Sequence, residues 1–399
     1  MQFDVVVVGA GPAGLGFALS LAGSGLRIGL VERQPEASLA EPGFDGREIA
    51  LTHLSRALLR RLGAWPRIPA AEISELREAV VLNGSAPRGA LRFDAAGRGA
   101  GPLGWLVPNH LIRRALYETA REQPDIHLLA GTAVAGVETG PEGATLRLAG
   151  GGEPIRARLA VAADTRFSEL RRRMGIPAAM KDFGKAMLVC RMEHEAPHHH
   201  VATEWFGERQ TLAMLPLNGN LSSAVLTLPE RETARLMRLD DAAFGAEVTR
   251  RYGGRLGAMR PVGTRHVYPL VAAYARRFVA ERFALMGDAA VGMHPVTAHG
   301  FNLGLRGAHT LAREIRAAQA RGGDIGGPGV LGRYEARHRR DTWPLYTATN
   351  AVVGLFTDDR PPARLLREAV LGLGARLPLV REAVVARLME RGGGRLARA

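Results

Sequence analysis

Residues 3–33 read FDVVVVGAGPAGLGFALSLAGSGLRIGLVER, and the rest of the chain is organised around this stretch. The valine-rich run 3–8 has the length and composition of a buried strand. Gly9, Gly11 and Gly14 follow, and apolar residues then recur at helical spacing as far as residue 22. A second apolar run at 26–31 ends in Glu32. The stretch therefore predicts a strand–turn–helix–strand unit that closes on an acidic residue.

Each glycine of this G-x-G-x-x-G turn has a physical task. Gly9 permits the tight turn, Gly11 lets the backbone approach a pyrophosphate, and Gly14 allows the helix to pack closely on the strand. The phosphates would meet backbone N–H groups at the positive end of the helix dipole. Glu32 can accept hydrogen bonds from a ribose diol. The unit predicts a bound ADP-ribosyl group, and by itself it does not choose between FAD and NAD.

Composition narrows the class of protein. The 399 residues fit two intertwined domains better than one small domain, and 46% hydrophobic residues can supply a sizeable core. The single cysteine, Cys190, excludes an internal disulfide and a cysteine-rich metal site and fits a reducing cytosol. Asp4 precedes the first apolar segment and glycines interrupt it, so no signal peptide is expected, and no apolar run is long enough to span a membrane. We expect a cytoplasmic protein.

The formal net charge of +14 is carried almost entirely by arginine, because Lys181 and Lys185 are the only lysines. Such a surface favours anionic partners, including phosphates and anionic lipid headgroups. The sequence contains no nucleic-acid-binding motif, and 6% aromatic residues give little for base stacking, so nucleic acid is not expected as a partner. Arginine usage also reflects genome composition, so the charge indicates a preference and not a function.

Hydrophobic periodicity divides the rest of the chain. Residues 45–64 are expected to form one helix with a leucine stripe, and a second helix is expected to begin at residue 107. Short strands are expected at 72–82 and 88–93, and a hairpin-like pair at 144–163. Residues 185–228 contain four strand-like runs separated by turns, followed by a helical segment at 230–252. This part predicts an antiparallel sheet with a helix, inserted into the first domain.

A second motif lies at residues 282–306, RFALMGDAAVGMHPVTAHGFNLGLR. A short strand ends in Gly287-Asp288, where the glycine allows a close turn and the carboxylate can hold a polyol hydroxyl. A loop containing His294 and His299 follows, and a helix from about Asn302 to Ala317 directs its N-terminus toward that loop. A helix N-terminus favours negative charge, such as that of a reduced flavin.

Together these motifs make the chain resemble the single-component FAD-dependent aromatic hydroxylases, most closely those of ubiquinone biosynthesis. The resemblance covers nearly the whole chain and includes further family positions: Arg47, Ala50, Leu51, Ser55, Leu59, Leu62, Gly63, Pro269-Leu270, His294-Pro295, Gly300, Gly304 and Leu355-Phe356. It implies an α/β (α+β) fold with a Rossmann-like FAD-binding domain, an inserted antiparallel-sheet substrate domain and C-terminal helices. The expected limits are 1–70, 101–175 and 272–345 for the FAD-binding domain, 71–100 and 176–271 for the substrate domain, and 346–399 for the C-terminal helical region.

The chain departs from the family pattern in its middle motif and in the loop before residue 300. The usual Asp-Gly pair is Asp164-Thr165, which affects the contact expected between flavin and nicotinamide. The usual Gly-Gln-Gly is Ala298-His299-Gly300, which changes the wall beside the flavin. The form HPVTAHGFNLGLRG at 294–307 is similar to that of a demethoxyubiquinol 5-hydroxylase subgroup.

The resemblance also implies a reaction. FAD is reduced by an external donor, NAD(P)H or a ferredoxin-type protein, and reacts with O₂ to form a C4a-hydroperoxyflavin that transfers one oxygen to an electron-rich ring. The expected substrate is a polyprenylated phenol or quinol of ubiquinone biosynthesis, with C5 of demethoxyubiquinol as the ring position. Because the cofactor supplies the difficult chemistry, the main demand on the protein is a dry, shaped cavity.

The expected site residues follow from the two motifs and the resemblance. Gly9, Gly11, Gly14 and Glu32 are assigned to the ADP half of FAD. By resemblance, Arg33 and Arg47 lie near the ADP or ribityl chain, Asp288 lies at the ribityl chain, and Gly300 and Asn302 lie at the isoalloxazine ring. His299 is the candidate catalytic residue because histidine titrates near neutral pH, although a loop histidine bonded to the backbone is an equal interpretation.

The sequence leaves other functions open. His194 and His198–His200 lack carboxylate or cysteine partners at ligand spacing, so we interpret them as a solvated turn and expect no metal. Residues 361–399 carry eight arginines and three glutamates among apolar residues, which indicates a packing or dimerisation helix, or one lying on an anionic membrane surface. The latter would place the protein on the inner face of the inner membrane, near other ubiquinone-biosynthesis proteins.

Alternative functions are an aromatic hydroxylase or reductase acting on a soluble substrate, a halogenase, an NAD-linked dehydrogenase, and a non-catalytic flavin- or lipid-binding scaffold. The halogenase interpretation lacks support because this sequence has no W-x-W-x-I-P stretch, and an NAD-linked dehydrogenase would leave the motif at 282–304 unexplained.

Overall fold

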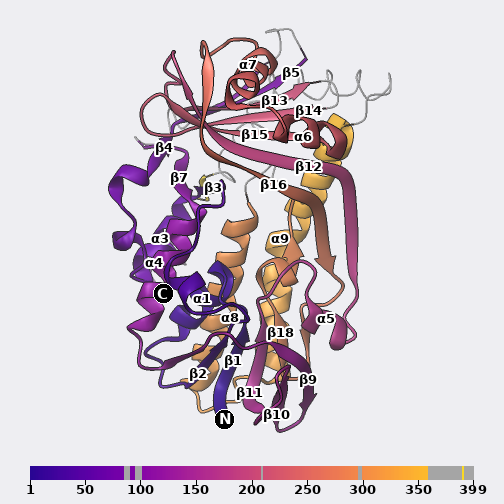
Figure 1. Ribbon diagram of the computed structural model, residues 1–399. Coiled ribbons are helices and arrows are strands. Elements are labelled where there is room, and N and C mark those ends of the chain that lie inside the picture. Colours follow the sequence, from indigo (N-terminus) through magenta and orange to yellow (C-terminus); the bar gives the residue numbers. More distant parts are fainter. Residues whose placement is uncertain (85–89, 95–100, 208–209, 295–298, 358–388, 391–399) are drawn as a thin grey trace.

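The computed structural model describes residues 1–84, 90–94, 101–207, 210–294, 299–357 and 389–390. Figure 1 shows two layered halves, with one sheet near the N-terminus and a larger sheet at the opposite end of the molecule. The fold is a mixed α/β fold, as the sequence predicts. In the described part of the chain, no helix has the length and apolar character needed to cross a membrane.

The first sheet is built around the valine-rich strand β1 (Gln2–Val8), which lies between two parallel neighbours and whose side chains are buried against the helices that cover the sheet. Its main order is β17-β18-β11-β1-β2-β8, and β9 and β10 extend it as an antiparallel hairpin. The other strands are β2 (Ile28–Val31), β8 (Ile126–Leu129), β9 (Val134–Gly140), β10 (Gly143–Leu148), β11 (Ile155–Ala162), β17 (Val279–Ala280) and β18 (Phe283–Leu285).

Helices enclose this sheet and complete its core. Helix α1 packs against both α8 and α4, which brings the N-terminal unit against the chain near residue 300. The helices of this half are α1 (Pro12–Leu21), α2 (Ala37–Ala40), α4 (Asn109–Arg121), α5 (Glu169–Arg173) and α8 (Gly300–Gln319). Their apolar faces form one large cluster of buried side chains with the sheet.

The larger sheet has the order β19-β16-β12-β15-β14-β13-β5-β6. All neighbours are antiparallel except β13 and β5, which run parallel. One face is covered by α6 (Glu230–Met237) and α7 (Asp241–Arg251). The strands are β5 (Glu78–Asn83), β6 (Leu91–Asp94), β12 (Ala178–His194), β13 (Val201–Gly207), β14 (Gln210–Pro216), β15 (Leu221–Pro229), β16 (Met259–Ala275) and β19 (Val291–Gly292).

Two long strands connect the halves. Strands β12 and β16 each have 17 residues and run between the sheets in Figure 1. Strand β16 continues past residue 271 to pair with β19, although that residue is the expected end of the substrate domain. A continuous strand therefore crosses the expected limit at 271/272, and the domain limits as a whole stay a prediction.

The predicted helix over residues 45–64 is wrong in its first part. Residues Glu48–Leu51 form strand β3, which pairs with β7 (Gly104–Pro108) in a small sheet that also contains β4 (Ser74–Leu76). Helix α3 (His53–Arg61) begins only after Thr52, whose hydroxyl accepts a hydrogen bond from the Ser55 N–H at 3.2 Å. Pairing with β7 therefore outweighs the helical spacing of the leucines.

The C-terminal part also differs from the expectation. Helix α9 spans Pro328–Thr357 and continues through Pro344, so the expected limit at 345/346 falls inside a helix. Short 3₁₀ turns occur at Trp65–Arg67, Ala70–Glu72 and Gly287–Ala289. The helices expected after Pro361-Pro362 and near Pro378 lie outside the described residues, whereas Met389 and Glu390 are described and buried.

Candidate functional site

The turn after β1 is shaped by close backbone contacts. Gly9 has a φ of +107°, and a β-carbon there would lie 2.5 Å from the Ala163 carbonyl oxygen. A β-carbon at Gly14 would lie 2.0 Å from the carbonyl oxygen of Gly9. At Gly11 the structure leaves open space, with nothing within 4 Å of such a β-carbon. Two glycines therefore close the turn, and the third leaves room for a ligand at its mouth.

The N-terminus of α1 opens onto that space. Gly11 is the N-cap and provides no side-chain bond to the first-turn N–H groups. The Glu32 carboxylate accepts hydrogen bonds from Ala10 N–H at 2.8 Å and Gln34 N–H at 2.9 Å, so it holds the end of β2 against the turn. Arg33, next in the chain, is exposed. These groups match a dinucleotide, because the N–H groups can donate hydrogen bonds to phosphates and the carboxylate can accept them from a ribose.

The second motif lies directly beside this turn. Gly287 has a φ of +55°, and a β-carbon there would lie 2.9 Å from the Ala13 β-carbon. Helix α8 packs against α1, and the small Gly16 leaves so little room that a β-carbon there would lie 2.8 Å from Leu305 Cδ1. The structure thus brings together two stretches that are almost 300 residues apart.

Asp288 is held by an arginine that the sequence motifs do not single out. Its Oδ2 accepts hydrogen bonds from Arg166 Nη2 at 2.8 Å and Nε at 3.2 Å. Arg171 is buried and donates to the Ala289 carbonyl oxygen at 2.9 Å, which fixes the same turn. Both arginines follow Asp164-Thr165 in the chain. The departure from the usual Asp-Gly pair was therefore the signal in the sequence that lies nearest to them.

Asp164 itself lies against the glycine turn, because a β-carbon at Gly9 would be 3.1 Å from the Asp164 α-carbon. Its Oδ2 accepts from the Glu169 N–H at 3.2 Å, whereas the buried Oδ1 has no hydrogen-bond partner in the described part of the chain. Burial raises the pKa of this carboxyl above its ordinary value. A buried oxygen of this kind beside the turn fits a ligand that would donate a hydrogen bond to it.

Helix α8 begins at the same place. His299 is its N-cap residue and is buried, and Gly300 is the first helical residue. Asn302 links α8 to the start of α3, because its Oδ1 accepts from the Thr52 N–H at 3.2 Å and its Nδ2 donates to the Ala50 carbonyl oxygen at 2.8 Å. Asn302 therefore has a visible structural task at the position expected beside the flavin ring.

Arg47 lies between the small sheet and the large one. Its Nη2 contacts Asp45 Oδ2 at 2.5 Å, and its guanidinium lies 5.2 Å from the centre of the Tyr268 ring. It also interacts electrostatically with Asp288. These contacts place Arg47 on the Asp288 side of the site.

One face of the large sheet is turned toward these groups. From β12, Arg191 donates to Glu48 Oε1 of β3 at 2.9 Å, and the Phe183 ring lies 4.8 Å from the His294 ring. From β16, the Tyr268 hydroxyl donates to the Asp45 carbonyl oxygen at 2.7 Å. We call the face that carries these side chains the inward face. Its centre includes an apolar cluster of Met187, Val189 and Leu270, with Phe183, Val225 and Tyr268 at its border.

The histidines of the turn at 194–200 form hydrogen bonds within the protein that the sequence did not predict. His194 is buried, with ring nitrogens bonded to the Ala196 carbonyl oxygen at 2.8 Å and the Ser222 hydroxyl at 2.9 Å, so its interpretation as solvated is wrong. His198 bonds to the Leu217 carbonyl oxygen at 2.7 Å. Within the described ranges, no group of histidine, cysteine or carboxylate side chains could hold a metal ion.

Comparisons with known proteins agree with this geometry. The family model for an FAD binding domain matches residues 2–349. Ubiquinone hydroxylase UbiM of Neisseria meningitidis is 46% identical over 392 residues, covering 97% of this chain and 85% of that protein. The 3-demethoxyubiquinol 3-hydroxylase of Escherichia coli is 27% identical, covering 93% and 94%. Among solved structures, p-nitrophenol 4-monooxygenase PnpA of Pseudomonas putida has a TM-score of 0.77 at 18% identity, covering 97% of this chain and 98% of that one.

Proposed function

The chain belongs to the FAD binding domain family and, within it, to the ubiquinone-biosynthesis hydroxylases. We propose that it hydroxylates the ring of a polyprenylated phenol or quinol, and that its specific reaction is the hydroxylation of demethoxyubiquinol at C5. The protein is an FAD-dependent monooxygenase. The observation that carries the substrate proposal is the apolar cluster of the inward face, whose bordering residues Phe183 and Tyr268 contact His294 and Asp45. Such a face suits an uncharged ring with a hydrocarbon tail.

FAD fits the residues present. We assign its pyrophosphate to Gly9, Gly11, Gly14 and the start of α1, its ribose to Glu32 with Arg33 nearby, and its ribityl chain to Asp288 and Arg47. His299, Gly300 and Asn302 at the start of α8 are assigned to the isoalloxazine ring. When bound, FAD supplies the redox chemistry that activates O₂, with NAD(P)H or a ferredoxin-type protein as electron donor.

The residues of the chain bind and orient the flavin and shield the substrate ring from water. The N-terminus of α8 favours an anionic ring, because the helix dipole is positive there. The cluster around Met187, Val189 and Leu270 excludes water from the ring that is to be hydroxylated. Arg166 and Arg171 hold the turn that carries Asp288, so the groups that face the cofactor stay in place.

A pair of glycine substitutions tests the cofactor site. Gly14→Ala places a β-carbon on the Gly9 carbonyl oxygen, so we expect loss of bound flavin and a lower melting temperature of the flavin-free protein. Gly11→Ala meets no protein atom and fills only the ligand space. We expect it to lower flavin content while leaving the melting temperature of the flavin-free protein unchanged. Full flavin content in Gly11→Ala would contradict the assigned position of the pyrophosphate.

Complementation tests the substrate. The gene is expressed in bacterial strains that each lack one ring hydroxylase of ubiquinone biosynthesis, and quinones are identified by mass spectrometry. We expect ubiquinone to return, and demethoxyubiquinol to disappear, in the strain blocked at C5. Rescue confined to another strain would move the proposed ring position, and no rescue, with a yellow and folded protein, would favour a soluble substrate.

We also propose peripheral contact with anionic membranes, because the substrate is a lipid and the segment 361–388 is basic and apolar. Flotation with phosphatidylglycerol vesicles is expected, and it should weaken as salt is added. Replacing Arg364, Arg367 and Arg376 by glutamine tests this while Met389 and Glu390 stay in place. Flotation that is unchanged by these substitutions would remove the segment from the contact.

A further inference from the structure

Strand β12 contains a bulge just before it reaches the apolar cluster of the inward face. Its pairing with β16 stops after Asp182 and resumes at Ala186, so residues 183–185 leave the ladder on that side. The Asp182 carboxylate closes the bulge, because its Oδ1 accepts a hydrogen bond from the Gly184 N–H at 2.9 Å. Gly184 has a φ of +61°, which glycine adopts without strain. A bulge changes the direction of side chains and is a common feature beside binding sites.

Lys185 lies at the end of this bulge and is directed to the inward face. On its other side β12 pairs with β15 without a break, and Lys185 lies opposite Pro229. Alternate residues of a strand share a face, so Lys185 points to the same side as Met187 and Val189. Those two residues belong to the apolar cluster to which we assign the substrate, and Phe183 packs against the same cluster. The half-buried side chain of Lys185 therefore lies at the border of that cluster.

Lys185 also acts on the residues beside the flavin turn. The Phe183 ring lies 4.8 Å from the ring of His294. Burial is the main reason for the low pKa of His294, about 4, and the positive charge of Lys185 lowers this pKa more than that of Arg166 does. Arg166 is the residue that donates to Asp288 Oδ2 at 2.8 Å. Lys185 is therefore linked both to the apolar cluster and to the turn that carries Asp288.

The residue type at this position is rare in the chain. Only two of the 53 lysine and arginine residues are lysine. Elsewhere at the site the cation is arginine, as at Arg166, which binds Asp288 through two N–H groups of its planar guanidinium. A lysine concentrates its charge on one atom, which suits a single oxygen. A half-buried cation on an apolar face also loses hydration, and an oxygen with negative charge would compensate for that loss.

We propose that the Lys185 ammonium group donates a hydrogen bond to a ring oxygen of the phenol or quinol substrate and holds that oxygen as the phenolate. The inference rests on the proposed function and adds the residue that activates the ring. When the phenolic O–H bond breaks, its electron pair stays on the oxygen and its proton passes to solvent water, while Lys185 keeps its own protons. No electron leaves the ring in this step. A phenolate is more electron-rich than a phenol, so it reacts faster with an electrophilic oxygen.

The assignment restricts the substrate class and the reacting carbon. A ring needs a free hydroxyl to make this contact, so a ring whose oxygens are all methylated is excluded. The charge of a phenolate is shared with the carbons ortho and para to its oxygen, and we expect hydroxylation there. A positive charge within about 5 Å lowers the pKa of an acid by about 1–3 units, whereas apolar surroundings alone raise it. Lys185 thus offsets the cost of ionising the ring in a dry site.

The test follows the ionisation of a bound ring in the oxidised holoenzyme. The ligand is a short-chain prenylated phenol with an isotopic label at its hydroxyl-bearing carbon, whose NMR shift reports the protonation state. In the wild type the bound ring should ionise at a pH about 1–3 units lower than in Lys185→Met. At neutral pH the variant should therefore hydroxylate about 10- to 1,000-fold more slowly at unchanged flavin content, and its rate should recover as the pH is raised.

Further variants separate the charge of the side chain from its shape. Lys185→Arg keeps the charge, so the bound ring should titrate closer to the wild type than in Lys185→Met. Lys181→Met is the matched control, because Lys181 is the other lysine, is exposed and has its Nζ 4.9 Å from the centre of the Phe183 ring. In this control the ring should titrate as in the wild type. If Lys185→Met does not fold, Lys185→Gln takes its place, since glutamine can donate a hydrogen bond but carries no charge.

Other results would overturn the inference. A merely structural role would lower the melting temperature of Lys185→Met and leave the pKa of the bound ring unchanged. An unchanged ring pKa together with an altered reduction potential of the flavin would show that the charge acts on the flavin instead. If the wild type neither binds nor hydroxylates prenylated phenols, the proposed function fails; if the wild type does both and only the variant comparison fails, the role of Lys185 fails alone.

Discussion

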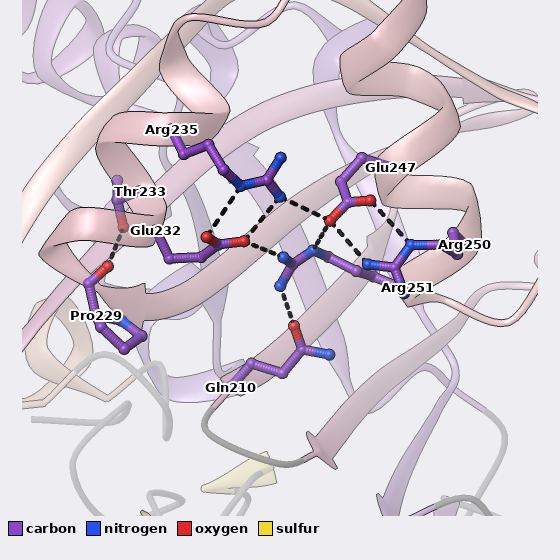
Figure 2. Close-up of polar contacts among 8 residues, drawn as sticks. All are labelled: Gln210, Pro229, Glu232, Thr233, Arg235, Glu247, Arg250 and Arg251. Atoms are coloured by element: carbon purple, nitrogen blue, oxygen red, sulfur yellow. Dashed lines mark hydrogen bonds and ion pairs between the residues drawn. The ribbon is translucent and has the colours of Figure 1, made fainter.

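The two faces of the large sheet differ in where their charged groups lie. The outward face packs on α6 and α7 through a closed apolar cluster that includes Leu188, Leu226 and Phe244. Five charged residues of α6 and α7 form one paired network above it (Figure 2), namely Glu232, Arg235, Glu247, Arg250 and Arg251. The inward face has smaller apolar clusters, with Lys185 at the border of one of them. The outward face is packed as a closed core, and the inward face is the one to which we assign the substrate.

Equivalent truncations on the two faces should have unequal effects on stability. Phe244 is fully buried, and Phe244→Ala should lower the free energy of unfolding by about 3–5 kcal/mol because it leaves a cavity in the closed cluster. Met187→Ala on the inward face should cost less than about 2 kcal/mol, below the usual range for a core methionine, and should instead lower the yield of hydroxylated product per NAD(P)H consumed. Urea unfolding and product analysis provide the measurements. Equal destabilisation by both substitutions would show that the inward face is packed as a core.

The contact between the halves gives the next largest effect. Arg191→Met leaves the Glu48 carboxylate buried and uncompensated, so the free energy of unfolding should fall by about 3 kcal/mol at pH 7. Burial already raises the pKa of Glu48, and loss of Arg191 should raise it further, so the loss should become smaller as the pH is lowered toward 5. The double variant Glu48→Gln with Arg191→Met should recover part of the stability. A pH-independent loss would mean that packing of Arg191 on Phe44, and not charge, holds the contact.

What the sequence predicts well is local. The turn at Gly9, Gly11 and Gly14 is read from spacing, because the close contact of Gly14 with the Gly9 carbonyl oxygen lies within one strand–helix unit, whereas the contact of Gly9 with Ala163 appears only in the fold. The strands of residues 185–228 are also predicted, because each is a short, mostly apolar run of strand length that ends at turn residues. The helix over 45–64 was partly wrong because β3 exists only through its partner β7, which comes more than 50 residues later.

What the sequence does not reveal depends on partners from distant elements. Arg166 becomes part of the site only because η3 (Gly287–Ala289) folds beside it. Lys185 lies in the stretch AMKDFGKAM, where its direction toward the inward face is known only after β15 is placed. Its being one of only two lysines in an arginine-rich chain was the available signal. The roles assigned to the cofactor-binding residues and to His299 stay predictions.

Glu390, near the end of the chain, links the start of α3 to α8 and should stabilise the protein less than the Arg191–Glu48 contact does. Its Oε2 accepts from the Thr52 hydroxyl at 2.9 Å, and its Oε1 contacts Arg306 Nη1 at 3.4 Å. We expect Glu390→Gln to lower the free energy of unfolding by about 1–2 kcal/mol, because a buried charge-assisted contact is lost. Thermal unfolding measures the loss. The control is Glu138→Gln, which removes an exposed pair with Arg147 and should cost less than about 0.5 kcal/mol. Equal losses in the two variants would mean that Glu390 acts as a surface charge.

The outward face should show the smallest and most salt-sensitive effect. Glu247 accepts hydrogen bonds from Arg235, Arg250 and Arg251, and hydrogen bonding to Arg250 is the largest of the contacts that lower its pKa to about 2. A carboxyl with a lowered folded-state pKa stabilises the protein above its unfolded pKa, and that contribution is lost as the pH falls toward about 2. Glu247→Gln should therefore cost about 1 kcal/mol at pH 7 and less at pH 4. Because the arginines around it are partly exposed, added salt should reduce the difference at pH 7. A Glu247→Gln variant that hydroxylated at an altered rate with unchanged flavin content would show that the two faces are coupled through the sheet.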